Sequence, residues 1–209
     1  MTFSIPEPEK VGRDRLVDAA WAAAHYPLPV ITVDLGTATT FNVIRENSVF
    51  CGGAIAPGLD MGLGALSERT AQLPRLDLQI PKRIIGRNTE ECILSGTIVG
   101  MAAMLDGMVQ RIEAELGSPA TLILTGGAAR FVEPLVLHPH IYDPNLLLKG
   151  WRSCVSGIVQ IKIVLPNIHQ TFSFCMTLKS VSVLQARFSL FFYGIATLLC
   201  VASPLFSFS

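Results

Sequence analysis

The acidic residues of this chain stop well before its end. All 16 Asp and Glu side chains lie at or before Asp143, and the rest of the 209 residues contains none. A folded domain needs carboxylates on its surface, both for solubility and at the N-termini of its helices. One globular fold therefore cannot account for the whole chain, which we divide near Gly150 into two parts of different composition.

Charge and cysteine content exclude several classes of protein. The 16 basic residues balance the 16 acidic ones, so the chain lacks the basic excess of a nucleic-acid-binding surface, and we expect no nucleic acid partner. The five cysteines form no CxxC pair, and no His cluster accompanies them at metal-ligand spacing. We therefore expect a cytoplasmic protein with reduced cysteines.

The order of apolar segments predicts an α/β fold, in which helices cover a sheet. Residues 1–11 contain two prolines and predict an irregular lead-in. The segments expected to be regular are a helix at 14–25, strands at 30–33, 41–44 and 49–51, helices at 59–73 and 89–116, a buried strand at 121–125 and a short helix ending near 135.

The turn from Asp34 to Thr40 is the most informative local feature. It carries the pattern Asp-x-Gly-Thr-x-Thr-Thr between two β-branched segments. Gly36 allows close approach of a ligand to the backbone, the Thr37 hydroxyl suits a phosphate oxygen, and the Asp34 carboxylate suits a cation. An ordinary hairpin is the alternative, because Asp, Gly and Thr are all common in turns.

Two other segments are candidates for binding or catalysis. In Gly12-Arg13-Asp14-Arg15, the Asp could accept a proton from a hydroxyl group beside two cations, or it could simply be a helix N-cap. Gly126-Gly127 follows the buried strand and could accept a nucleotide, or it could be only a tight turn. The chain has no Walker A, GxGxxG or GxSxG pattern, so a P-loop, a Rossmann site and a serine hydrolase are not indicated.

Taken in order, the motifs resemble those of the type III pantothenate kinases. GRDR, VDLGTATTFNV, CGGAIAPGLDM, IGRNTEECILSG and LTGG follow one another at the family's spacings over residues 12–150. The resemblance implies a ribonuclease H-like fold of the acetate and sugar kinase and actin superfamily, of which 12–150 would be mostly the second of two duplicated domains. It also implies a homodimer that phosphorylates pantothenate with ATP, Mg²⁺ and a monovalent cation, K⁺ or NH₄⁺.

The resemblance also implies roles for individual residues. Pantothenate would bind at 12–15 and at Thr89, with Asp14 as the proton acceptor. Asp34 would be the ligand of the monovalent cation. ATP would contact Gly36 and Thr37 through its phosphates and Gly126-Gly127 through its adenosine.

Both ends of the chain depart from the family pattern. The family begins with an Asp-x-Gly-Asn-Thr loop for ATP phosphates, and nothing like it precedes Gly12. We therefore expect a truncated kinase that is inactive as it stands. Residues 151–209 match nothing in the family, and a frameshift or a false gene model would explain them. The alternatives are a non-catalytic accessory or regulatory relative, and a membrane-attached fragment anchored by the uncharged segment 188–207, a weak candidate for a spanning helix.

Overall fold

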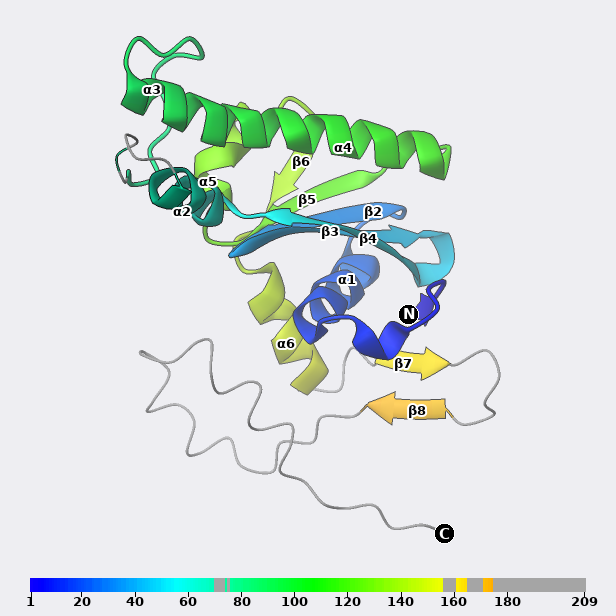
Figure 1. Cartoon of the computed structure of the whole chain (residues 1–209). Helices are drawn as coiled ribbons and strands as arrows, with labels where there is room; N and C mark the ends of the chain where they lie inside the picture. Colours follow the sequence, from blue (N-terminus) through cyan, green and yellow to red (C-terminus); the bar gives the residue numbers. More distant parts are fainter. Residues whose placement is uncertain (70–73, 75, 156–160, 165–170, 175–209) are drawn as a thin grey trace. The chain divides into compact units, whose positions relative to one another are not determined.

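A mixed six-stranded sheet with the order β1-β4-β3-β2-β5-β6 forms the centre of the structure (Figure 1). The computed structural model describes residues 1–69, 74, 76–155, 161–164 and 171–174. The strands of the sheet are β1 (Thr2–Phe3), β2 (Val30–Leu35), β3 (Ala38–Arg45), β4 (Val49–Pro57), β5 (Thr121–Thr125) and β6 (His140–Tyr142). β2, β3 and β4 pair in antiparallel fashion, while β5 runs parallel to both β2 and β6. The carboxyl ends of β2, β5 and β6 therefore lie at one edge of the sheet.

Helices cover both faces of the sheet, with α4 on one side and α1 and α6 on the other (Figure 1). The helices are α1 (Arg13–His25), α2 (Leu59–Arg69), α3 (Thr89–Leu94), α4 (Gly100–Leu116), α5 (Ala129–Val132) and α6 (Leu146–Val155). Shorter 3-10 turns are η1 (Pro8–Lys10), η2 (Glu46–Ser48) and η4 (Glu133–Leu135), and η3 (Ser95–Val99) is a π-helical segment between α3 and α4. These helices and strands confirm the predicted α/β class.

The alternation of side chains along β2 creates two separate cores. Ile31, Val33 and Leu35 are fully buried on the α4 side. Val30 belongs to the core on the α1 side. Because successive side chains of a strand point to opposite faces, Asp34 lies on the same face as Val30, toward α1.

The segment Thr89–Leu116 is one continuous helical stretch of 28 residues, and an 18-residue window within it has a mean hydropathy of 1.7. Within the part of the chain that the structure describes, it is the one helix that is long and apolar enough to cross a membrane. Its Ile98, Ala102, Leu105 and Val109 are instead buried against the sheet. We therefore assign it as a core helix.

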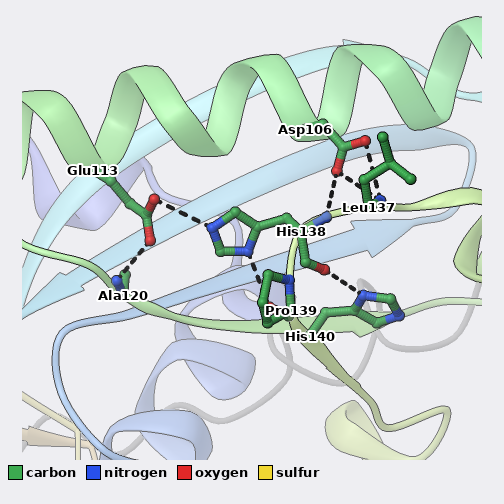
Figure 2. A network of polar contacts seen from close by, with 7 residues as sticks. All are labelled: Asp106, Glu113, Ala120, Leu137, His138, Pro139 and His140. Atoms are coloured by element: carbon green, nitrogen blue, oxygen red, sulfur yellow. Dashed lines mark hydrogen bonds and ion pairs between the residues drawn. The ribbon is translucent and has the colours of Figure 1, made fainter.

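A polar network fixes the connection between β5 and β6 to α4 (Figure 2). Asp106 accepts hydrogen bonds from the backbone N–H groups of Leu137, at 3.1 Å, and His138, at 2.9 Å. The His138 ring lies 3.2 Å from Glu113, which also accepts from the N–H of Ala120 at 2.8 Å. Two carboxylates of one helix thus hold the loop that carries β6 into the sheet.

Several elements differ from the sequence prediction. β4 runs on to Pro57 through Gly52 and Gly53, because both glycines adopt positive φ angles beside a register shift in its pairing with β3. The lead-in is not wholly irregular, since β1 pairs with β4. β6 has only three residues and was not predicted.

The end of the described chain adds further elements. α6 continues past Gly150 to Val155. β7 (Ile161–Val164) and β8 (Thr171–Phe174) form a two-stranded antiparallel sheet in the part that matches no family motif. The uncharged segment 188–207 lies outside the described residues.

Candidate functional site

Three parallel strands end side by side at the candidate site. Asp34, near the end of β2, is paired in register with Thr125, the last residue of β5. Asp143 follows β6, and its backbone N–H donates to the carbonyl of Leu124 on β5 at 2.9 Å. The carboxyl ends of parallel strands are the usual place for ligand sites in α/β proteins. Two of the side chains presented there are carboxylates.

Helix α1 brings two further carboxylates to this edge of the sheet. Asp14 lies in its first turn and Asp18 follows one turn later, so both point from the same side of the helix. Burial raises the pKa of Asp34, and the charge of Asp14 raises that pKa further. Asp14, on the α1 face of the sheet, is therefore near enough to Asp34 for its charge to act on that carboxyl group.

Asp18 is the most perturbed group of the site. It is only 1% exposed, and its Oδ1 atom has no hydrogen-bond partner among the described residues. Burial raises the pKa of Asp18 to about 8, and the charges of Asp34, Asp14 and Asp143 add to the shift. This shift favours the protonated, neutral form of Asp18, which reduces the repulsion among the four acidic side chains.

The hairpin turn between β2 and β3 is tighter than predicted. β2 continues to Leu35 and β3 begins at Ala38, so only Gly36 and Thr37 form the turn. The Gly36 N–H donates to the carbonyl of Ala38 at 3.1 Å, and the Thr37 carbonyl accepts from the N–H of Gly58 at 3.1 Å. Thr37 itself is exposed at the tip. Its backbone is thus fixed while its side chain lies at the surface, where a ligand can reach it.

Gly126 packs directly on the Asp34 carboxylate. It has a φ of +94°, and a Cβ atom there would collide with Asp34 Oδ1 and with both the backbone N and O of Leu35. The next glycine, Gly127, is exposed and faces open space. Of the glycine pair after β5, Gly126 therefore lies in close contact with Asp34, and Gly127 leaves an open surface.

Arg15 is bound to the sheet through its side chain. Its Nε donates to Asn42 Oδ1 at 2.7 Å, and its Nη2 donates to the carbonyl of Phe41 at 3.4 Å. Burial lowers the pKa of Arg15, and the charge of Asp14 opposes that shift. The guanidinium therefore lies beside Asp14, over β3, with a fixed position.

The structure brings most of the predicted site residues together, with one exception. Gly12 is the N-cap of α1, without a side-chain hydrogen bond, so Asp14 is not the N-cap that one reading of the sequence suggested. Arg13 is exposed in the first turn of the same helix. Thr89 begins α3, which continues through η3 into α4. Helix α4 covers the opposite face of the sheet from α1, the helix that carries Asp14 (Figure 1).

Sequence reasoning missed three polar residues of the site. Asp18 could have been found, because its spacing of four from Asp14 places both on one helix face. Asn42 gives no such signal, because its partner Arg15 lies 27 positions away, and Asp143 is joined to Tyr26, 117 positions away, only by the packing of the fold. Asp143 accepts from Lys149 Nζ at 2.7 Å and from the Tyr26 hydroxyl at 3.1 Å.

A separate cavity of about 350 Å³ lies on the other side of the hairpin turn. Its lining is mostly apolar and comes from α2, α3, η3 and α4, with Leu59, Ile93, Met101 and Met104 among its residues. It contains none of the four carboxylates. We therefore place the candidate site at the strand ends rather than in this cavity.

Fold and site together define an α/β domain whose candidate site lies at the carboxyl ends of parallel strands, between a glycine turn and a helix that carries acids. The family described as type III pantothenate kinase matches residues 1–111. A type III pantothenate kinase from Thermomicrobium roseum is 45% identical over 149 residues, and one from Thermus thermophilus is 46% identical over 149 residues. The chain belongs to the type III pantothenate kinase family.

The match covers only part of those relatives. It includes 71% of this chain but 58% of the Thermomicrobium protein, and 72% of this chain but 59% of a relative from Hyphomonas neptunium that is 41% identical. Among solved structures, a conserved Campylobacter jejuni protein assigned to the Baf family of transcriptional activators has a TM-score of 0.54 at 22% identity. The alignment covers 76% of this chain and 69% of that one, and it supports the fold alone.

Proposed function

We propose that this chain carries the pantothenate and phosphate site of a kinase that transfers the γ-phosphoryl group of ATP to pantothenate. The product is 4'-phosphopantothenate, and the reaction is the first step of coenzyme A biosynthesis. The observation that carries the proposal is the meeting of Asp14 and Asp34 on one face of the sheet, beside the turn at Gly36 and Thr37. The family membership of the chain supplies the substrate class.

The proposed mechanism relies on positioning and charge, which dominate phosphoryl transfer. Asp14 is exposed in the first turn of α1, so it can accept the proton of the pantothenate hydroxyl as that oxygen attacks. Arg15 neutralises the pantothenate carboxylate, and Arg13 contributes a second positive charge nearby. The hydroxyl of the exposed Thr37 side chain binds a phosphate oxygen.

Asp34 is the candidate ligand for a cation in this site. Its carboxylate is half-buried, and Gly126 packs so closely on Oδ1 that a cation would have to approach from the side away from that glycine. Among the described residues, no group of three or more His, Cys, Asp or Glu is arranged to hold a metal ion. K⁺ or NH₄⁺ at Asp34 would therefore need further oxygens from backbone, hydroxyl or phosphate groups, and so would Mg²⁺. Such cations supply charge neutralisation for the phosphates of ATP.

The finer assignments belong to the same proposal. The fold would be the ribonuclease H-like fold of the actin superfamily, with the described sheet as the second of two duplicated domains. Gly126 and Gly127 would contact the adenosine, Thr89 would be a further pantothenate contact, and the enzyme would act as a cytoplasmic homodimer. A non-catalytic regulatory role is not favoured, because the matched relatives at 41–46% identity are named as kinases.

Calorimetric titration of the 209-residue chain with pantothenate, and with Mg²⁺ and a non-hydrolysable ATP analogue, tests the proposal. Saturable binding of pantothenate is expected, and Asp60→Asn, an exposed substitution on α2, should leave it unchanged. In a full-length relative, the substitution that matches Asp14→Asn should lower pantothenate-dependent ADP release by about 10²–10⁴-fold, the usual contribution of a general base. The absence of pantothenate binding would refute the proposal for this chain.

A further inference from the structure

A buried polar relay connects two strands of the sheet to Arg15. Asn42 on β3 and Thr32 on β2 are both 0% exposed. Asn42 Oδ1 accepts from Arg15 Nε at 2.7 Å, while Asn42 Nδ2 donates to Thr32 Oγ1 at 3.1 Å. Both halves of the Asn42 amide are therefore engaged, one with the helix and one with the neighbouring strand.

The chemistry of the partners fixes the direction of the relay. A guanidinium has only donors, so the Asn42 atom that faces Arg15 must be the carbonyl oxygen. The amide nitrogen then points to Thr32, whose hydroxyl is the available acceptor. Neither group can rotate without leaving a buried polar atom unpaired, which is costly in the interior of a protein.

The relay determines which edge of Arg15 remains available. Nε and one N–H of Nη2 are bound to Asn42 and to the carbonyl of Phe41. The guanidinium also lies 5.9 Å from the centre of the buried Phe50 ring. Among the residues that the structure describes, no hydrogen bond engages the outer fork, formed by Nη1 and the second N–H of Nη2, and such a fork matches the two oxygens of a carboxylate.

The identity of residue 42 also sets the charge of the site. Asn is neutral, so it orients Arg15 without cancelling its positive charge. An Asp at this position could make the same hydrogen bond but would pair with the guanidinium as an ion. The free fork would then lose much of its attraction for an anion in this half-buried environment.

We propose that Asn42 is a positioning residue, which holds Arg15 through the Thr32 relay so that its outer fork and its full charge are free for the carboxylate of the substrate. This inference rests on the proposed function for the identity of the anion. The hydrogen bonds that link Arg15, Asn42 and Thr32 do not depend on that function. Asn42 touches no substrate atom in this arrangement and acts only through Arg15.

The experiment compares Asn42→Asp with Asn47→Asp in the full chain. Asn47 is exposed in η2, so its substitution makes the same change of charge away from Arg15. Calorimetric titration with pantothenate should show binding at least about tenfold weaker for Asn42→Asp, a factor that corresponds to ~1.4 kcal/mol. Asn47→Asp should bind within about twofold of the wild type. Equal affinities of Asn42→Asp and the wild type would overturn the inference.

A second measurement separates this inference from the proposed function. In ¹⁵N NMR spectra, the Nε–H of Arg15 should give a resolved, slowly exchanging signal in the wild type and in Asn47→Asp. Thr32→Val, which keeps the shape of the side chain and removes the acceptor, should speed that exchange, and Asn42→Leu should abolish the protection. If the wild type shows this signal but does not bind pantothenate, the proposed function fails and the relay stands. If neither substitution changes the exchange rate of the Arg15 Nε–H signal, the proposed relay is wrong.

Discussion

Replacing the buried acid Asp18 with Asn should change how the stability of the protein depends on pH. The folded state raises the pKa of Asp18 to about 8, from an ordinary value of 3.8. Between these two values the folded protein holds a proton that the unfolded chain has released. The stability contributed by this proton is fully present below about pH 4 and is lost as the pH rises toward 8.

The size of the effect follows from the same linkage. Each pH unit within the window lowers the free energy of unfolding by about 1.4 kcal/mol through this one group. Between pH 5.5 and 7.5, the wild type should therefore lose roughly 3 kcal/mol that Asp18→Asn does not lose. Asn has no proton to release in the unfolded chain, so this pH-dependent loss of stability is absent from the variant.

Urea unfolding at several pH values measures this difference directly. The gap between Asp18→Asn and the wild type should widen in favour of the variant as the pH rises. Asp60→Asn, an exposed acid on α2, should give a curve parallel to the wild type. Parallel curves for Asp18→Asn as well would show that Asp18 ionises normally in the folded protein, and the description of the carboxylate cluster would then be wrong.

Two further substitutions test the geometry of the fold. Gly126→Ala should destabilise the protein by about 2–4 kcal/mol in urea unfolding, because the added Cβ collides with Asp34 and the φ angle is positive. The control Gly127→Ala places its Cβ in open space and should change the free energy of unfolding by less than about 0.5 kcal/mol. Equal effects of the two substitutions would contradict the close packing of Gly126 on Asp34. Asp106→Ala should cost about 0.5–1.5 kcal/mol, because it removes the hydrogen bonds to two backbone N–H groups, one of them exposed to water, and Gln110→Ala, exposed on the same helix, should be nearly neutral. An unchanged thermal midpoint for Asp106→Ala would contradict a stabilising role of that network.

Local sequence signals were sufficient for much of the fold. The spacing of apolar residues located α1 and the long helix from Thr89, and β-branched segments located β2, β3 and β5. β6 could not be predicted, since a strand of three residues has too little periodicity and depends on pairing with β5. The π-helical segment at 95–99 has no local signal either, because a helix and a π-bulge share the same pattern of side chains.

The candidate site was predictable where its residues are neighbours in sequence. The hairpin turn and the start of α1 each carry their own pattern, and the family resemblance joined them. The relay from Arg15 to Asn42 spans 27 positions, so only the packing of α1 on β3 shows it. For Thr89 the sequence motif is clear, but the motif alone does not show that α3, which Thr89 begins, is remote in one chain from the helix of Asp14.

The most direct test of the central claim is an NMR titration of the ¹⁵N-labelled full chain, first with pantothenate and then with Mg²⁺ and a non-hydrolysable ATP analogue. If Asp14 and Asp34 share one binding site, the amide signals of residues 12–15, 36–37 and 126–127 should move together. Shifts confined to the apolar cavity around Ile93 and Met101, or no saturable shifts at all, would contradict the account.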